Sequence, residues 1–295
     1  MPAQIFGIVP PMTTPFDADG RLDEEALRAD ARYLVEVAAV HGVAICGSTG
    51  EGHTLTTAET RRITEIVTGE VDGRIPVITG IITDSTASAI ERGLAVKEFG
   101  VAALQVTPPH YLFRPDDDAM LRHFEALSRG TGLPILIYNV VPWCYLSPQL
   151  LTRIIDGVEG VVGVKQSAGD MKMLADLILL LGDRGRIMSA VDALMYPSFL
   201  LGAHGAIAAM LSAVPGLYLQ MWDAVQRGDQ ARCRALHEKL LPIWNAICTD
   251  NLPANVKYCM ELQGRRAGLP RPPMPPTAES RKPLIRAALH GAGIL

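Results

Sequence analysis

The sequence is poor in charged and aromatic side chains. Of its 295 residues, 20% are charged and 5% are aromatic, and the formal net charge is −4. Nucleic-acid-binding domains present a basic patch or stripe, and nothing in this charge balance suggests one. We therefore expect no nucleic-acid partner, and a small-molecule substrate that is held by local groups rather than by a global field.

Cysteine is also scarce, and its spacing excludes two further classes of protein. The five cysteines form no C-x₂-C pair and are odd in number, which argues against a zinc site and against a disulfide framework. We expect no metal and a reducing, cytoplasmic setting. The chain shows no signal-peptide pattern at its start, and its longest apolar stretch, residues 174–181, is too short to cross a bilayer. We expect no membrane partner.

What the sequence does contain is a regular alternation of short apolar runs and longer amphipathic ones. The short runs are rich in Val and Ile and bounded by Gly or Pro, as expected for strands buried on both faces. The expected strands cover residues 5–9, 43–46, 75–79, 102–106, 135–138, 161–165, 186–189 and 205–208. The expected helices cover residues 24–40, 57–68, 85–99, 116–128, 147–155, 171–181, 193–201 and 214–226.

Eight such alternations predict an α/β protein in which a parallel sheet closes into a (β/α)₈ TIM barrel. An open dinucleotide-binding sheet would carry a glycine-rich first turn, whereas residues 10–15 here read Pro-Pro-Met-Thr-Thr-Pro. We place the barrel in residues 1–226. Three more helical patterns, over residues 230–248, 253–263 and 278–290, predict a C-terminal helical region, 227–295, that packs on the barrel.

Active residues of such barrels project from the carboxyl ends of the strands, and Lys165 ends the apolar run 161–165. A charged ammonium loses hydration at such a position. The neutral amine that is favoured there can attack a ketone to give an iminium ion, which acidifies the adjacent carbon. The alternative is a lysine that reaches from the strand end into solvent.

Two further groups follow predicted strands. Residues 47–52 read Gly-Ser-Thr-Gly-Glu-Gly, and successive backbone N–H groups in such a turn can form a nest for a carboxylate. Ser48 and Thr49 add hydroxyl groups. Tyr138 ends the fifth expected strand, where its hydroxyl can transfer a proton. A simple turn and a packed structural tyrosine are the alternatives.

Together these motifs resemble the signatures of the dihydrodipicolinate synthase / N-acetylneuraminate lyase family. The matching segments are Gly-Ser-Thr-Gly-Glu at 47–51, Tyr-Asn-Val at 138–140 and Gly-Val-Lys at 163–165, and the likeness continues through Thr-Pro at 107–108 and residues 202–207. The resemblance implies a class I aldolase: a lyase that joins or cleaves pyruvate or a related 2-oxo acid through a lysine iminium, with or without dehydration. It implies no cofactor.

The resemblance also implies roles for single residues. Lys165 would form the Schiff base, and Tyr138 would donate and accept the protons. Ser48 and Thr49 would hold the carboxylate in the turn that begins at Gly47. Ser48 keeps the hydroxyl that a threonine supplies to the proton relay of the synthase branch.

Two expectations concern the surroundings of that group. Ile207 would offer its backbone carbonyl near the lysine. Tyr111 resembles the tyrosine that synthases insert from a neighbouring subunit, although its segment is two residues longer than usual. The resemblance therefore implies a homo-oligomer, either a dimer or a tetramer.

One departure bears on the second substrate, an aldehyde. Synthases that use aspartate semialdehyde carry an arginine shortly after the Tyr-Asn-Val-Pro segment, but residues 139–146 here read Asn-Val-Val-Pro-Trp-Cys-Tyr-Leu. A guanidinium holds a carboxylate by two hydrogen bonds, whereas Trp143 offers aromatic surface. We expect an aldehyde that is bulkier or less charged than aspartate semialdehyde, with His110 or Arg114 as alternative carboxylate partners.

Several alternatives stay open. The chain could be a 4-hydroxy-tetrahydrodipicolinate synthase proper, or an aldolase or dehydratase of 2-keto-3-deoxy sugar acids. A barrel that binds a 2-oxo acid without catalysis belongs to a different class. A metal- or flavin-dependent barrel enzyme would need clustered ligands, which the sequence lacks, or a phosphate-binding loop, for which residues 202–205 are a weak candidate.

Overall fold

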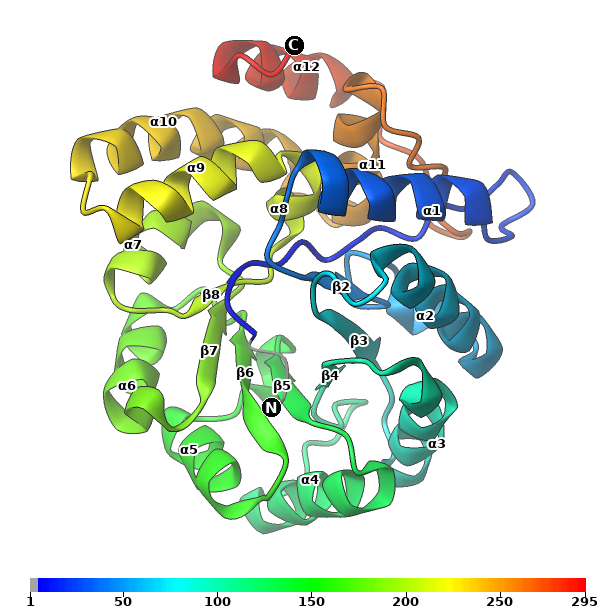
Figure 1. The fold of residues 1–295 in the computed structure, drawn as a ribbon, viewed down its shortest axis with the longest axis vertical. Helices are drawn as coiled ribbons and strands as arrows, with labels where there is room; N and C mark the ends of the chain where they lie inside the picture. The colour runs from blue at the N-terminus through cyan, green and yellow to red at the C-terminus, as the bar shows by residue number, and fades with distance from the viewer. Residues whose placement is uncertain (1–4) are drawn as a thin grey trace.

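The structure, a computed structural model, describes residues 5–295. Eight parallel strands form one sheet at the centre of the molecule, inside a ring of helices (Figure 1). The strands are β1 (Gly7–Ile8), β2 (Val43–Ile45), β3 (Val77–Ile81), β4 (Ala103–Val106), β5 (Ile135–Asn139), β6 (Val161–Gln166), β7 (Arg186–Ser189) and β8 (Gly205–Ala206). Their order in the sheet is β1-β8-β7-β6-β5-β4-β3-β2, so each strand from β2 to β7 lies beside its successor.

The helices of the ring follow their strands one by one. They are α1 (Glu24–Arg32), α2 (Thr57–Val71), α3 (Thr86–Val96), α4 (Asp117–Thr131), α5 (Pro148–Gly157), α6 (Met171–Leu181), α7 (Met195–Leu200), α8 (Ala209–Ala213) and α9 (Pro215–Gln226). Most of them begin at a residue whose side chain accepts a hydrogen bond from the first turn, which satisfies one free N–H group. These N-cap residues include Asp23, Thr56, Ser85, Asp116, Ser147 and Asp170.

The sheet closes into a barrel at two places. β1 pairs with β8 through Gly7 and Gly205, and the chain just after β1 pairs with β2 through a parallel bridge between Pro11 and Ala44. A Cβ atom on Gly205 would lie 2.3 Å from the backbone nitrogen and oxygen of Gly7. The two strands can therefore approach at this point only because the residue is glycine.

Apolar side chains fill the interior of the barrel. The inner cluster comprises Ile5, Val9, Ala44, Ile78, Ala103, Leu136, Met188 and Ile207. A filled interior leaves no pore, so polar groups of the inner face gather at the carboxyl ends of the strands, as in other barrels of this kind. The predicted fold class is confirmed.

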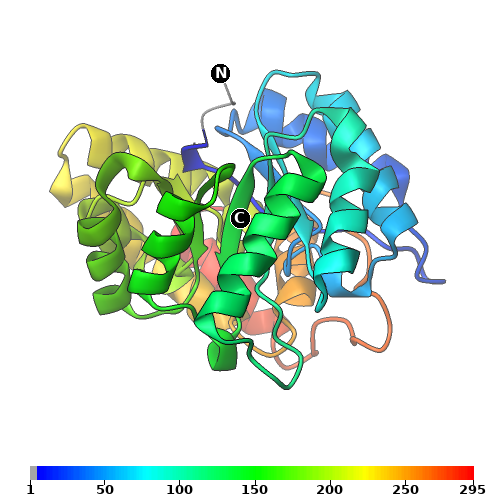
Figure 2. The same cartoon turned by 90° about the horizontal axis from the view of Figure 1, so that it is seen from below.

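Three helices complete the chain: α10 (Gln230–Ile247), α11 (Leu252–Leu262) and α12 (Lys282–Ala292). They lie together on one side of the barrel (Figure 1), where α10 contacts α7 and α9, and α11 contacts α8. The segment between α11 and α12 and the loop before α4 lie at the same end of the barrel, at the bottom of Figure 2. The boundary that we placed between residues 226 and 227 stays a prediction.

The differences from the expected elements are local. The helix expected over residues 24–40 becomes π-helical at η1 (Tyr33–Val37), and short 3₁₀ helices occur at η2 (Gly52–Thr54), η3 (Lys97–Phe99), η4 (Pro142–Cys144), η5 (Gly182–Arg184) and η6 (Asp192–Leu194). Helix α8 was not predicted, since its five residues fall in an apolar stretch that continues the strand pattern. Within the described chain, no helix combines the length and the hydropathy needed to cross a bilayer.

Candidate active site

A cavity of about 440 Å³ opens at the carboxyl end of the barrel. Its walls include the end of β5, the end of β6 and the segments that follow β2, β7 and β8, so five of the eight strands contribute to it. Six of the residues that follow or end these strands in the wall are Ser48, Thr49, Tyr138, Lys165, Asp192 and Ile207. Five of these six were expected from the sequence, and the structure brings those five together.

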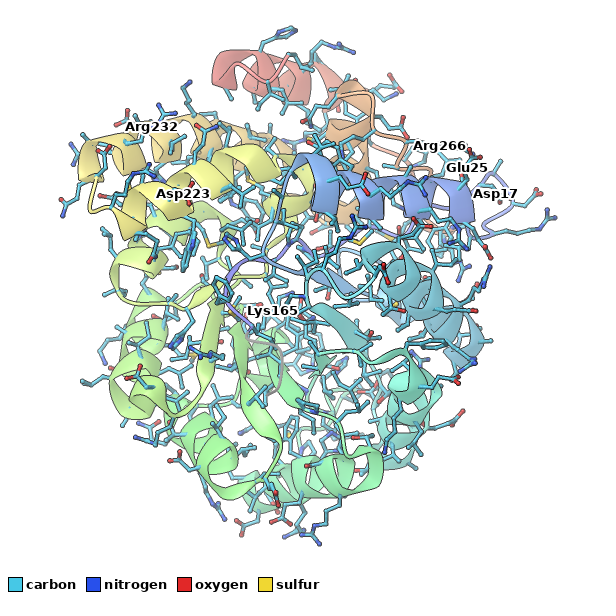
Figure 3. All side chains as sticks on the ribbon, in the orientation of Figure 1. Asp17, Glu25, Lys165, Asp223, Arg232 and Arg266 are labelled. Carbon is cyan, nitrogen blue, oxygen red and sulfur yellow. The ribbon has the colours of Figure 1, made fainter. Side chains whose placement is uncertain are left out.

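Lys165 lies at the centre of the molecule, whereas the other labelled charged side chains of Figure 3 lie at its rim. The residue is 3% exposed. In the sheet it pairs with Tyr138 of the neighbouring strand β5, and its Nζ lies 3.8 Å from the centroid of the tyrosine ring. The amine therefore has an aromatic face beside it, in an enclosed site that excludes most water.

Tyr138 connects this amine to the turn after β2. Its ring is buried, and its hydroxyl donates a hydrogen bond of 3.2 Å to Oγ of Ser48, 90 residues earlier in the chain. Two hydroxyl groups in contact can pass a proton from one to the other. The tyrosine thus has both a position beside the amine and a route by which its proton can be exchanged.

The turn after β2 is tightly wound. The N–H of Gly52 donates to the carbonyl of Gly47 over 2.9 Å, and the N–H of Glu51 donates to the carbonyl of Ser48 over 3.0 Å. A Cβ on Gly52 would lie 1.9 Å from the carbonyl oxygen of Cys46, so no other residue fits there without a shift of the backbone. The glycines let the chain reverse closely enough to bring Ser48 and Thr49 to the cavity.

Of the remaining four expected residues, Gly47 begins the turn and lines neither cavity, and the other three lie in an adjoining cavity of about 750 Å³, which shares Ser48 with the first. His110 and Tyr111 come from the loop before α4, and Trp143 comes from η4. The indole N–H of Trp143 donates to the carbonyl of His110 over 2.8 Å. Tyr111 is 71% exposed and Trp143 is 66% exposed, so in a single chain they form an open rim and do not enclose Lys165.

Asp192 is a candidate site residue that we did not predict. It stands three residues after β7, and one of its carboxylate oxygens accepts the N–H of Met210 at the start of α8 over 2.7 Å. Burial raises the pKa of Asp192 to about 6, although the N–H groups of α8 and the charge of Lys165 oppose the rise. The rule that functional residues follow the strands applied here as well and could have found it. In the described residues, no group of three or more His, Cys, Asp or Glu side chains could hold a metal ion.

The outer wall of the cavity comes from the C-terminal region. It includes Trp244, Asp250, Asn251, Leu252, Pro253 and Met274. These residues carry no local motif, and their distance along the chain from Lys165 hides the contact from sequence analysis. The C-terminal region therefore shapes the pocket in addition to packing on the barrel.

Comparison with known proteins identifies the family. The model of the Dihydrodipicolinate synthetase family matches residues 4–292. The chain belongs to this family. The 4-hydroxy-tetrahydrodipicolinate synthase of Methanopyrus kandleri is 36% identical over 295 residues, which cover 99% of this chain and 98% of the relative.

Solved structures of the family agree. YagE, a prophage protein of E. coli K12 whose structure is in complex with pyruvate, has a TM-score of 0.94 at 27% identity and covers 99% of this chain and 100% of its own. The dihydrodipicolinate synthase of Acinetobacter baumannii, complexed with pyruvate, has a TM-score of 0.93 at 28% identity, with coverage of 99% and 100%. The predicted family is confirmed, and with it the predicted class of enzyme, a Schiff-base-forming lyase.

The raised pKa of Asp192 predicts a pH dependence of stability. Between pH 3.8, the ordinary pKa, and about pH 6, the folded chain keeps a proton that the unfolded chain loses. The free energy of unfolding of the parent protein therefore falls as the pH rises through this window. Asparagine keeps an oxygen acceptor for Met210 and never ionises. As the pH rises through the window, the free energy of unfolding of Asp192→Asn should therefore increase by about 1–3 kcal/mol relative to that of the parent.

Urea denaturation of both proteins at several pH values from 4 to 7 measures this difference. A difference in unfolding free energy that stays constant with pH would contradict the prediction. Replacement of the exposed Asp183 by asparagine, in η5 and outside the lining of the cavity, is the control for a general effect of losing one carboxylate.

Proposed function

We propose that Lys165 of this protein forms an iminium ion with pyruvate or a related 2-oxo acid, and that the resulting enamine adds to an aldehyde. The observation that carries the proposal is the buried amine beside the hydrogen-bonded hydroxyls of Tyr138 and Ser48. The pyruvate complexes of two similar structures support the choice of a 2-oxo acid.

In the first half of the proposed reaction, the neutral amine of Lys165 adds to C2 of the 2-oxo acid. The former carbonyl oxygen takes one proton from the amine nitrogen and a second from Tyr138, and it leaves as water. The hydroxyl of Ser48 can pass protons to and from Tyr138. The turn at Ser48 and Thr49 holds the carboxylate through hydroxyl and backbone N–H groups. Ile207 lines the same cavity, and its backbone carbonyl would accept a hydrogen bond near the lysine.

In the second half, the phenolate of Tyr138 takes a proton from C3 and so gives the enamine, because the iminium nitrogen withdraws electrons from the adjacent carbon. C3 of the enamine attacks the aldehyde carbon, and the new alkoxide takes a proton from Tyr138. Water then hydrolyses the iminium and frees Lys165. The same steps in reverse cleave the carbon–carbon bond. In a substrate with a hydroxyl on C4, the enamine can instead expel that hydroxyl, which takes a proton from Tyr138 and leaves as water.

The charges of the cavity favour an uncharged, hydroxyl-bearing aldehyde. Asp192 and Asp250 line the part of the wall beyond Lys165, and among the described residues that line this cavity there is no arginine. The carboxylate of aspartate semialdehyde would be repelled here, whereas hydroxyl groups can donate to Asp192 and bond to the amide of Asn251. An aldolase or dehydratase of 2-keto-3-deoxy sugar acids fits this wall.

The second candidate is 4-hydroxy-tetrahydrodipicolinate synthase, the name carried by the relative from Methanopyrus kandleri. One residue favours it. Arg114 lines the adjoining cavity together with Ser48, although its guanidinium is engaged with Asp117 at 2.8 Å. Release of that ion pair would free a cation for a second carboxylate.

Trapping of the iminium tests the central step. We expect borohydride reduction in the presence of pyruvate to leave a stable adduct on Lys165, and Lys165→Met to abolish both the adduct and turnover. Tyr138→Phe should still form the adduct but more slowly, with turnover reduced by about 10²–10⁴-fold. Mass spectrometry of proteolytic peptides locates the adduct.

Lys257, a second buried lysine, is the internal control, because its amine is bound to a carboxylate. An adduct on Lys257 or on surface lysines, without one on Lys165, would overturn the proposed role. Binding of pyruvate with no adduct at all would favour a barrel that binds a 2-oxo acid without catalysis.

The choice of aldehyde is tested by steady-state kinetics with pyruvate at saturation. We expect kcat/KM for glyceraldehyde or a longer hydroxyaldehyde to exceed that for aspartate semialdehyde by at least about tenfold, since only the latter brings an unpaired carboxylate into the pocket. The opposite order, abolished by Arg114→Gln, would establish the synthase alternative.

We also propose that the protein is a homo-oligomer, a dimer or a tetramer. Two apolar surfaces are exposed, and such surfaces mark protein interfaces. One lies at the rim of the second cavity and comprises Tyr111, Leu112, Phe113 and Trp143. The other lies on α6 and at the end of α7 and comprises Leu179, Leu180, Leu200 and Leu201.

Sedimentation should therefore give a mass of two or four times 31.8 kDa. Replacing Leu179 and Leu200 by aspartate should reduce a tetramer to a dimer, because the substitution places charge in one of the two surfaces only. A monomeric parent protein at micromolar concentration would contradict the proposal.

A further inference from the structure

A buried ion pair joins the turn after β2 to the C-terminal region. Nζ of Lys257, on α11, lies 2.5 Å from a carboxylate oxygen of Glu51, and the two side chains are 2% and 1% exposed. The other oxygen of Glu51 accepts the backbone N–H of Arg271 over 2.8 Å. Lys257 also donates to the carbonyl of Leu269 over 2.7 Å. The carboxylate is thus held by two groups that come more than 200 residues later.

The backbone of Glu51 explains why this hold matters. Its φ of 55° lies in the left-handed region, which a residue with a Cβ adopts only when its surroundings impose it. In that conformation its N–H donates to the carbonyl of Ser48, and its carbonyl accepts the N–H of Thr54. The direction of the peptide groups at Ser48 and Thr49 therefore depends on Glu51.

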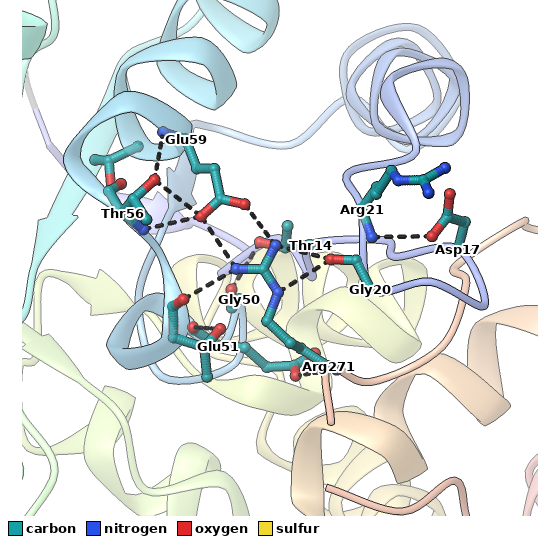
Figure 4. Close-up of polar contacts among 11 residues, drawn as sticks. Thr14, Asp17, Gly20, Arg21, Gly50, Glu51, Thr56, Glu59 and Arg271 are labelled. Carbon is teal, nitrogen blue, oxygen red and sulfur yellow. Dashed lines mark hydrogen bonds and ion pairs between the residues drawn. The ribbon is translucent and has the colours of Figure 1, made fainter. Parts of the chain in front are cut away.

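The flanks of the turn are fixed from the same side (Figure 4). The guanidinium of Arg271 donates to the carboxylate of Glu59, to the carbonyl of Thr54 and to the carbonyl of Gly20. These contacts hold the chain after the turn. The ion pair of Lys257, in contrast, acts on Glu51 within the turn itself.

A second buried ion pair serves for comparison, because it attaches the C-terminal region to the barrel at another place. Arg265 contacts Asp30 of α1 at 2.6 Å, with side chains 9% and 5% exposed. It joins the same two parts of the chain but does not touch the turn. Burial of a charged pair costs hydration and is weak support for stability alone, whereas it can fix one conformation among several.

We infer that Lys257 is a positioning residue, which acts through Glu51 to set the Ser48–Thr49 turn for the carboxylate of the 2-oxo acid. This inference rests on the proposed function of the turn. The C-terminal region is then a part of the substrate site through its hold on the turn, besides lining the cavity. Lys257 itself does not touch the substrate.

The test compares two ketones, one with a carboxylate and one without. Pyruvate and acetone are each trapped on Lys165 by borohydride over a range of ketone concentrations, in the parent protein and in Lys257→Met. We expect the half-saturating concentration of pyruvate to rise by about tenfold or more in the variant. A tenfold rise corresponds to the loss of about one hydrogen bond to a charged group. That of acetone should stay within about twofold, because the turn does not bind it.

Arg265→Met is the matched control, since it removes a buried cation from the same region. It should lower the urea midpoint while leaving the two half-saturating concentrations unchanged. The double variant Glu51→Gln, Lys257→Met removes both charges, and it replaces the single variant should that one not fold. If the turn has lost its position, the half-saturating concentration of pyruvate stays raised in the double variant. If an unpaired Glu51 repels pyruvate, that concentration returns to the parent value.

Three results would overturn the inference: an equal loss for both ketones in Lys257→Met, no loss for either, or parent-like pyruvate trapping in the double variant. Failure of the proposed function would give a different experimental result. In that case the parent protein itself gives no pyruvate adduct on Lys165.

Discussion

The close packing of the barrel interior is the constraint on which the site depends. Eight strands can surround one another only if their inward side chains fill the space between them, and the apolar cluster around Leu136 and Met188 fills much of it. An apolar interior cannot satisfy polar side chains. Those of the inner face are therefore confined to the carboxyl ends of the strands, where Lys165 and Tyr138 stand side by side. The same packing supplies the enclosure that the amine needs.

Much of this arrangement could be predicted because it follows from local patterns of the sequence. Each strand appears as a short run of Val and Ile, and each helix as an amphipathic stretch with a capping residue. The strand-end rule then placed Lys165, Tyr138 and Ser48 in one cavity although Ser48 and Tyr138 are 90 residues apart. Parallel topology made that step possible, since it brings all strand ends to one face.

What could not be predicted depends on contacts that leave no local pattern. Helix α8 is only five residues long, and the N–H of Met210 in its first turn donates to the carboxylate of Asp192, in another loop. The outer wall of the cavity comes from the segment near Asn251, and the hold on Glu51 comes from Lys257, 206 residues away. Tyr111 and Trp143 line the adjoining cavity and are largely exposed in the single chain, so their roles stay predictions.

The two halves of the cavity are built from different kinds of structure. The half that would receive the 2-oxo acid is built on strand ends and on a turn fixed by buried hydrogen bonds and a buried ion pair, so little change is tolerated there. The half that would receive the aldehyde is built from loops after β7 and from the C-terminal region. Loops accept substitution more readily than the elements they connect. Chemistry at Lys165 could therefore stay constant in such a barrel, while under the proposed function Asp192, Asp250 and Asn251 would set the second substrate by charge and hydrogen bonding.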